Sequence, residues 1–433
     1  MPRETKDSGI EWIGEIPSTW KLCKIKHVCS TIGSGTTPKS GNLEFYENGT
    51  INWIQSGDLY NKATLTNVST LITKRAFSST TSLKLYIAPY IVIAMYGASV
   101  GNTAISTIDA CTNQACCCLK PNISTHLKYL FYWINHCKSD FLDKAEGGTQ
   151  PNISQQKIAN QYFLQPSFSE QQLIANFLDY KCNEIDALHA DIEKQIATLE
   201  DYKKSVITEA VTKGLNPDIE MKDSGSTYWN TIPNHWNLSD IKYLFEIVKR
   251  IAGKEGFDIL SVTQKGLKIK DISNNEGQIA ESYANYQFVY PNDFVMNHMD
   301  LLTGWVDCSQ YFGVTSPDYR VFRLRNQANN LSYYKYVMQV CYMNKIFYSL
   351  GQGVSTLGRW RLQTSSFNNF QIPVPPISEQ QEIADYLDQK TTEIDSIISA
   401  KKQQLDVLEN YKKSLIYEYV TGKKEVPSYA NAE

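Results

Sequence analysis

Two segments of this chain carry a helical pattern in which apolar positions recur every seven residues. In the first segment one row runs through Leu178, Ile185, Ile192, Leu199 and Val206, and a second row follows three residues later at Lys181, Leu188, Gln195 and Tyr202. The second segment has the same rows at Leu387, Ile394, Lys401, Leu408 and Leu415, and at Lys390, Ile397, Gln404 and Tyr411. Such heptads are typical of helices that pack along a narrow seam. We therefore predict two long helices with a helix–helix seam at Leu178, Ile185, Leu188, Ile192, Leu199, Leu387, Ile394, Ile397, Leu408 and Leu415.

The two helical segments are copies of one another. The 45 residues that start at Ser169 align with the 45 that start at Ser378, and 23 positions are identical. A shorter repeat, KDSG followed by IP and Trp, starts at Lys6 and again at Lys222. Because the long copies match in length and register, we expect an antiparallel coiled coil with pseudo-twofold internal duplication. Two independent core helices in two duplicated domains are the alternative.

The regions between the repeats differ from each other and read as short strands broken by Gly, Asn, Ser and Pro. Examples are YIVIAMYG and YRVFRLR, and each region has one helical stretch, near 127–143 and 331–350. This mixture predicts two α+β globular lobes. The expected division is 1–168 for the first start motif and lobe, 169–214 for the first long helix, 215–377 for the second start motif and lobe, 378–423 for the second helix, and 424–433 for a tail.

The charge of the chain is distributed unevenly. The 433 residues hold 42 Lys+Arg and 45 Asp+Glu, yet residues 21–168 hold 13 and 7, and residues 237–377 hold 14 and 11. Basic lobes on an acidic helical frame suit a polyanion such as nucleic acid. A rival from another class is a coiled-coil scaffold whose lobes bind proteins.

Other features of the composition narrow the class of protein. The early residues are charged and no apolar run reaches the roughly 20 residues of a membrane span, so we expect a soluble, cytoplasmic protein without a membrane partner. The ten cysteines include no C-x-x-C and are expected to be buried, reduced thiols. The segment GSGTTPKS resembles a phosphate-binding loop, but Pro38 stands where that loop needs its second glycine.

Nothing in the sequence assembles a catalytic centre. There is no G-x-S-x-G, no H-E-x-x-H and no Asn- or Asp-Pro-Pro-aromatic tetrad of an amino-group DNA methyltransferase. The six histidines are scattered along the chain. We therefore expect a binding protein with no catalytic residue, metal site or cofactor of its own.

The duplicated motifs resemble those of the specificity subunits of type I restriction–modification systems. The carriers are PSFSEQQLIANFLD and PPISEQQEIADYLD, the helix ends EDYKKSVITEAVTKG and ENYKKSLIYEYVTG, and the lobe segments WIQSGDL, MYGASVGNTAI and SPDYRVFRL. The resemblance covers nearly the whole chain. It implies two target-recognition domains, each reading one half of a split double-stranded DNA site, held apart by two long antiparallel conserved helices.

The same resemblance implies the partners. The helices would dock two adenine-N6 methyltransferase subunits, and restriction subunits would join through them. S-adenosylmethionine, and ATP with Mg²⁺ in the restriction complex, would be bound by those partner subunits.

The polar loops of the lobes are the candidate DNA-reading elements. Arg, Lys, Asn and Gln can contact base edges, whereas Ser, Thr and backbone amides hold phosphates. From loop position and chemistry we expect DNA contacts from Lys39, Gln55, Ser56, Ser99, Asn102, Asn113, Gln150, Lys265, Asn297, Ser355, Arg359 and Arg361.

Overall fold

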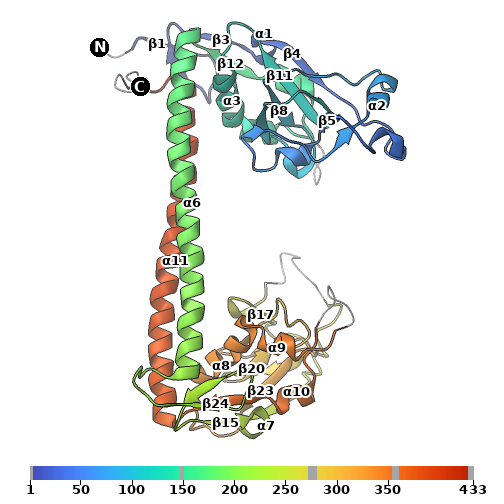
Figure 1. The fold of residues 1–433 in the computed structure, drawn as a ribbon. Helices are drawn as coiled ribbons and strands as arrows, with labels where there is room; N and C mark the ends of the chain where they lie inside the picture. Colours follow the sequence, from blue (N-terminus) through green and yellow to red (C-terminus); the bar gives the residue numbers. More distant parts are fainter. Residues whose placement is uncertain (1–2, 147–150, 272–279, 354–359, 428–433) are drawn as a thin grey trace. The chain divides into compact units, whose positions relative to one another are not determined.

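The chain divides into two compact units, each with its own lobe (Figure 1). The computed structural model describes residues 3–146, 151–271, 280–353 and 360–427. The first unit comprises Met1–Asp191 and Gln403–Glu433, and the second comprises Ile192–Lys402. Each unit therefore contains one lobe and one part of each long helix, and the boundary between units falls inside the helices.

The first lobe is built on a five-stranded sheet of order β4-β11-β8-β9-β6. Its neighbouring strands are antiparallel except for β6 and β9. The strands are β4 (Cys29–Ser34), β6 (Thr64–Leu65), β8 (Tyr90–Ala94), β9 (Thr103–Ser106) and β11 (Cys116–Pro121). A smaller sheet joins β10 (Ala110–Thr112), β5 (Ile51–Ile54) and β7 (Leu71–Ile72). The helices are α1 (Ile25–Val28), α2 (Lys74–Ser79), α3 (Leu127–His136), α4 (Lys138–Asp143) and α5 (Gln155–Ala159).

Strand β8 is apolar throughout because both faces of the sheet are covered. Ile91 and Ile93 pack in the core that includes α3, whereas Tyr90 and Val92 pack in a second core on the other face. The neighbouring strand β11 explains the run of three cysteines in the same way. Cys117 joins the first core, and Cys116 and Cys118 join the second. All three are free thiols, and burial raises the pKa of Cys117 to about 12.

The second lobe is built on a four-stranded antiparallel sheet of order β16-β23-β20-β21. These strands are β16 (Phe245–Val248), β20 (Phe294–Met296), β21 (Val306–Cys308) and β23 (Arg320–Leu324). Two strand pairs add to it: β17 (Leu260–Thr263) with β18 (Gly266–Ile269), and β19 (Gln287–Val289) with β22 (Gly313–Thr315). The helices are α7 (Ile241–Leu244), α8 (Leu331–Met343), α9 (Ile346–Ser349) and α10 (Thr364–Asn368).

The sequence duplication has a structural counterpart in four short strand pairs. The repeated KDSG motif forms β1 (Thr5–Asp7) with β2 (Glu15–Pro17), and β13 (Met221–Asp223) with β14 (Thr231–Pro233), in the same register. Each lobe then begins and ends on one antiparallel pair. These pairs are β3 (Lys21–Lys24) with β12 (Tyr162–Gln165), and β15 (Asn237–Asp240) with β24 (Gln371–Val374).

Each lobe is followed directly by one of the two long helices, α6 (Phe168–Lys213) and α11 (Ile377–Val420). Their first residues precede the predicted ones by one, and in α6 the hydroxyl of Ser167 accepts a hydrogen bond from the backbone of Glu170. In the first unit the start of α6 contacts the end of α11, with the rings of Phe177 and Tyr419 4.6 Å apart. In the second unit Lys203, near the end of α6, binds Asp395 of α11 at 2.6 Å. Within each unit the two helices therefore run antiparallel (Figure 1); a coiled-coil geometry stays a prediction.

The second row of the helix–helix seam lies four residues, not three, after the first. Leu188 and Ile397 are 49% and 47% exposed, so their predicted place in the seam is wrong. Ile196 and Ile398, at 8% and 7%, are buried instead. The first row is buried at Leu178, Ile185, Ile192, Leu387, Ile394 and Leu415 and half-buried at Leu199 and Leu408. Both spacings fit one heptad, and the buried positions of Cys182, Thr391 and Tyr419 also follow the +4 spacing.

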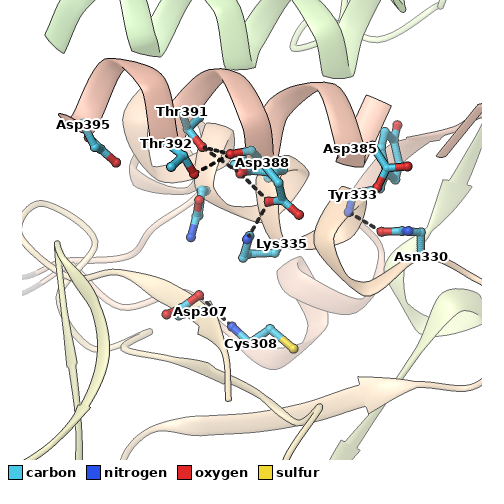
Figure 2. A network of polar contacts seen from close by, with 12 residues as sticks. Asp307, Cys308, Asn330, Tyr333, Lys335, Asp385, Asp388, Thr391, Thr392 and Asp395 are labelled. Atoms are coloured by element: carbon cyan, nitrogen blue, oxygen red, sulfur yellow. Dashed lines mark hydrogen bonds and ion pairs between the residues drawn. The ribbon is translucent and has the colours of Figure 1, made fainter. Parts of the chain in front are cut away.

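The repeated SEQQ segment anchors each lobe to its helix. In the second unit the buried Gln380 accepts a hydrogen bond from the backbone N–H of Asn330, just before α8, and its Nε2 donates to the carbonyl of Pro375. Two turns further along, Asp388 accepts from the Tyr336 hydroxyl at 2.7 Å. It also accepts from Lys335 at 3.4 Å (Figure 2). Gln380 and Asp388 therefore fix the start and the side of α8 against α11.

The first unit repeats this anchor with equivalent residues. Gln171 accepts from the backbone N–H of His126, before α3, and donates to the carbonyl of Pro166. Asp179 accepts from the Tyr132 hydroxyl at 2.7 Å. In both units the glutamate directly before this glutamine also accepts a tryptophan N–H. Trp20 donates to Glu170, and Trp236 donates to Glu379. The motif is thus a structural joint between lobe and helix.

Candidate nucleic-acid interface

The described contact candidates of the first lobe lie on loops near one edge of the five-stranded sheet. Cys117, near the start of β11, pairs with Ser34 at the end of β4, and Cys116 pairs with Ala94 at the end of β8. The hairpin from β8 to β9 turns at the same edge. The loops with Lys39, with Ser99 and Asn102, and with Asn113 therefore share this edge, which we call the first-lobe rim (residues 35–40, 55–56, 96–102 and 113–115).

Hydrogen bonds between the loops hold the rim together. The Thr37 hydroxyl donates to Oε1 of Gln114 at 2.6 Å, and the backbone N–H of Asn113 donates to the carbonyl of Ile54, next to Gln55. The backbone N–H of Met95 donates to the carbonyl of Ala115 at 2.7 Å. At Gly35 any Cβ would fall 1.8 Å from the Thr112 carbonyl oxygen, so only glycine fits there. The structure thus brings four separate segments into one surface.

Several predicted contact residues use their side chains to shape these loops. Gln55 donates to the Thr70 hydroxyl at 2.9 Å, Ser99 donates to the carbonyl of Tyr96, and Asn113 accepts from the backbone of Ala115. Asn102 accepts from Nζ of Lys138 at 2.8 Å. The hydrogen bonds of these side chains hold the loops in place. A DNA contact from one of these side chains would require it to exchange or share its present hydrogen bond.

Lys39 and Ser56 differ, because their side chains have no hydrogen-bond or ion-pair partner among the described residues. Lys39 is exposed and Ser56 is half-buried. Among the described contact candidates of the first lobe, these two side chains are therefore the ones available for a ligand without rearrangement.

The second lobe has a cleft of about 720 Å³. Residues from three segments line it: Lys268 and Lys270 from the β17–β18 hairpin, Asn297 after β20, and Ser316 before β23. Three tyrosines, Tyr283, Tyr286 and Tyr319, also line it. Three aspartates, Asp271, Asp300 and Asp318, line it as well. Lysines can contact phosphates, and aromatic rings can stack on bases.

Sequence reasoning missed most of this cleft. It selected Asn297 but not the two lysines or the three tyrosines, since tyrosines in a strand-rich region usually belong to the core. Asn297 itself accepts from the backbone of Met299 at 3.3 Å. Lys265 is exposed at the tip of the hairpin, and Arg361 is exposed on a separate loop. Gln150, Ser355 and Arg359 lie outside the described residues.

The described residues assemble neither a metal centre nor a membrane-spanning helix. Within those ranges no group of three or more His, Cys, Asp or Glu side chains is placed to hold a metal ion. No described helix combines the length and apolar character needed to cross a bilayer. What the two lobes share is a surface of polar loops.

Comparison with known proteins identifies a family. The family described as type I restriction modification DNA specificity domain matches residues 17–198 and 233–407. Among curated proteins, the EcoR124I/EcoR124II specificity subunit from Escherichia coli is 25% identical over 52% of this chain and 48% of its own length. The chain therefore spans about half of that relative. The MjaVIII specificity subunit from Methanocaldococcus jannaschii is 25% identical over 69% of this chain and 70% of its own length.

Solved structures show the same fold. A chain from a structure of the type I R-M system, described for its complex assembly and conformational transition, has a TM-score of 0.69 at 12% identity. The alignment covers 94% of this chain and 99% of that one. The HsdS subunit from Thermoanaerobacter tengcongensis has a TM-score of 0.51 at 13% identity, over 96% and 100%.

Proposed function

This chain belongs to the family of type I restriction–modification DNA specificity subunits, and we propose that each of its lobes reads one half of a bipartite double-stranded DNA site. The observation that carries this proposal is the combination of a duplicated frame with two unlike loop surfaces. The framing strands, anchors and helices repeat in register, whereas the first-lobe rim and the second-lobe cleft differ in strand order and in side chains. Two different loop surfaces on equivalent frames suit a DNA site whose two halves differ in sequence.

The long helices would set the unread gap between half-sites and dock two methyltransferase subunits. Exposed apolar side chains support docking, since Leu188 and Ile397 occupy equivalent positions of the two copies and remain outside the seam. The partner subunits would bind S-adenosylmethionine and transfer the methyl group to adenine N6, after extruding the base from the duplex. Restriction subunits with ATP and Mg²⁺ would join through them.

The role of this chain in that complex is recognition without catalysis. Pure chain incubated with DNA, Mg²⁺ and S-adenosylmethionine should neither cut nor methylate the DNA. Either product would contradict the proposal, because the chain would then need a catalytic centre of its own.

Methylome sequencing tests the proposal directly. Cells would express the chain with its cognate methyltransferase subunit, and controls would express each alone. The expected result is a new bipartite adenine-methylated motif only when both are present. An assembled complex that yields no new motif would instead favour a scaffold whose lobes bind proteins.

The acidic balance of the chain predicts weak DNA binding by the isolated subunit. Because phosphate contacts release counterions, this binding should fall steeply between 50 and 200 mM salt. A salt titration by fluorescence anisotropy, with the assembled complex as the comparison, measures it. Tight, sequence-specific binding by the isolated chain at the higher salt would contradict the prediction.

A further inference from the structure

The second lobe contains a buried arginine with no carboxylate partner among the described residues. Arg320, the first residue of β23, is 4% exposed. One guanidinium nitrogen donates to the carbonyl of Leu362 at 3.1 Å and to the Thr364 hydroxyl at 3.3 Å. The guanidinium also lies 4.5 Å from the centre of the Phe367 ring. All of these partners are neutral, and a buried charge without an opposite charge is costly, so this arrangement calls for an explanation.

Arg320 holds the segment that carries Arg361. Its acceptor Leu362 directly follows Arg361, and the backbone of Leu362 also donates to the carbonyl of His298 at 3.0 Å. Arg361 exchanges two backbone hydrogen bonds with Gln352, both at 3.0 Å. Hydrogen bonds therefore hold the backbone of Arg361 and Leu362 in place, whereas the side chain of Arg361 is exposed.

The surroundings of Arg361 offer donors and positive charge. Its guanidinium has no ion pair or hydrogen bond among the described residues. The indole N–H of the preceding Trp360 is buried and also lacks an acceptor there. Burial lowers the pKa of His298, and the nearby positive charges of Arg320 and Arg361 lower it further. This position offers hydrogen-bond donors and positive charge, and neither arginine has a carboxylate partner among the described residues, so it suits an anion.

We propose that Arg361 contacts a backbone phosphate of the bound DNA and that Arg320 is the positioning residue that holds it. This inference rests on the proposed DNA-recognition function and adds the chemistry of one contact. A phosphate is favoured over a base edge because two arginine charges without carboxylate partners attract any anion. Every DNA sequence presents phosphates. Arg320 itself is too buried to reach the ligand.

The experiment measures DNA affinity of the full chain assembled with its methyltransferase subunits. Fluorescence anisotropy from 50 to 200 mM salt would use two duplexes, one with the methylated motif and one without it. The variants are Arg361→Ala, Arg361→Lys and Arg320→Met. The matched control is Arg323→Gln, on the same strand, where the arginine is half-exposed and paired with Glu246 at 3.3 Å.

A phosphate contact predicts one pattern. Arg361→Ala should weaken binding to both duplexes by the same factor and reduce the slope of log K against log salt by about 0.9. Arg361→Lys should retain most of the slope. Arg320→Met should reproduce the Arg361→Ala effect, and the double variant should add little to it, whereas Arg323→Gln should change neither quantity. A structural defect alone would not alter the salt slope by one charge.

Two outcomes would overturn the inference while leaving the proposed function intact. In one, Arg361→Ala leaves both duplexes and the slope unchanged. In the other, it abolishes discrimination at one base pair with the slope unchanged, which would assign a base contact. If the unaltered complex prefers no duplex at all, the proposed function fails first. Because Arg361 is exposed, its variants test the contact even if Arg320→Met does not fold.

Discussion

In each unit a single buried glutamine makes hydrogen bonds that join the lobe to its long helix. Gln380 is 1% exposed, accepts a hydrogen bond from the backbone of Asn330 and donates to Pro375 and Asn329. Each of these groups would lose its partner in a truncation, and a buried unsatisfied group costs about 1–3 kcal/mol. Several bonds of the anchor between lobe and helix therefore depend on this one residue.

Gln380→Ala should lower the free energy of unfolding by about 2 kcal/mol for that reason. Urea denaturation followed by circular dichroism measures the change. Gln389→Ala is the matched control, since Gln389 lies on the same helix and bonds only to Glu393 at an exposed position. Equal losses for the two variants would show that burial of the amide is not the cause.

His298 predicts a pH dependence of stability. Burial, and then the charges of Arg320 and Arg361, lower its pKa from 6.5 to about 3. The unfolded chain therefore takes up a proton below pH 6.5 that the folded chain refuses until about pH 3, so stability falls as the pH falls through this window.

Comparison with His298→Gln isolates this contribution. Between pH 7.5 and 5.5 the wild-type chain should lose about 1.4 kcal/mol more of its free energy of unfolding than the variant. Urea denaturation at both pH values gives the difference. Parallel losses in the two proteins would mean that this histidine is not the group responsible.

At the scale of elements, the long helices show where a periodic pattern is sufficient and where it is not. The seven-residue period located both helices to within about one residue of their starts, because it depends only on local spacing. The period alone could not choose between the +3 and +4 rows. Lys203 and Lys412 belong to the +4 row and reach Asp395 and Asp186 on the other helix, which a count of apolar residues overlooks.

The adjacent residues Ile397 and Ile398 separate the two rows experimentally. Ile398→Ala should cost about 2 kcal/mol or more of unfolding free energy because the side chain is 7% exposed in the seam. Ile397→Ala should stay within about 0.5 kcal/mol, because that side chain is 47% exposed. Thermal and urea denaturation of the two variants measure both. The reverse order would restore the +3 seam.

The lobes were less predictable than the helices because their sheets depend on pairings between distant residues. Strand β8 was evident from its apolar run, but its order with β4, β9 and β11 was not. The apolar segment TLITKRAF contributes only the two-residue strand Leu71–Ile72 before α2 begins at Lys74. Loop position and side-chain chemistry predicted several residues of the rim. The cleft tyrosines are distant in the sequence, so only the folded structure shows that they lie together.

At the scale of the whole molecule, the proposed spacing role of α6 and α11 can be tested by lengthening them. Seven residues, one heptad, inserted at equivalent positions of both helices would preserve the seam and add about 10 Å of rise. At about 3.4 Å per base pair, the unread gap of the methylated motif should grow by about three base pairs, with both half-sites unchanged.

Methylome sequencing of cells with the lengthened chain reads this result directly. Insertion of a heptad in one helix only is the control, because it places the two seams out of register and should abolish methylation. An unchanged gap with the double insertion would mean that the helices do not set the spacing.

The free thiols allow the opening of each unit to be followed separately by alkylation. Eight of the ten cysteines belong to the first unit, and only Cys308 and Cys341 to the second. Because burial raises the pKa of these thiols, the folded protein should react slowly with an alkylating reagent. The mass added on alkylation therefore records which unit has opened and when. Since α6 and α11 pass through both units, simultaneous labelling of all ten would reveal that the shared helices make the two lobes a single cooperative folding unit.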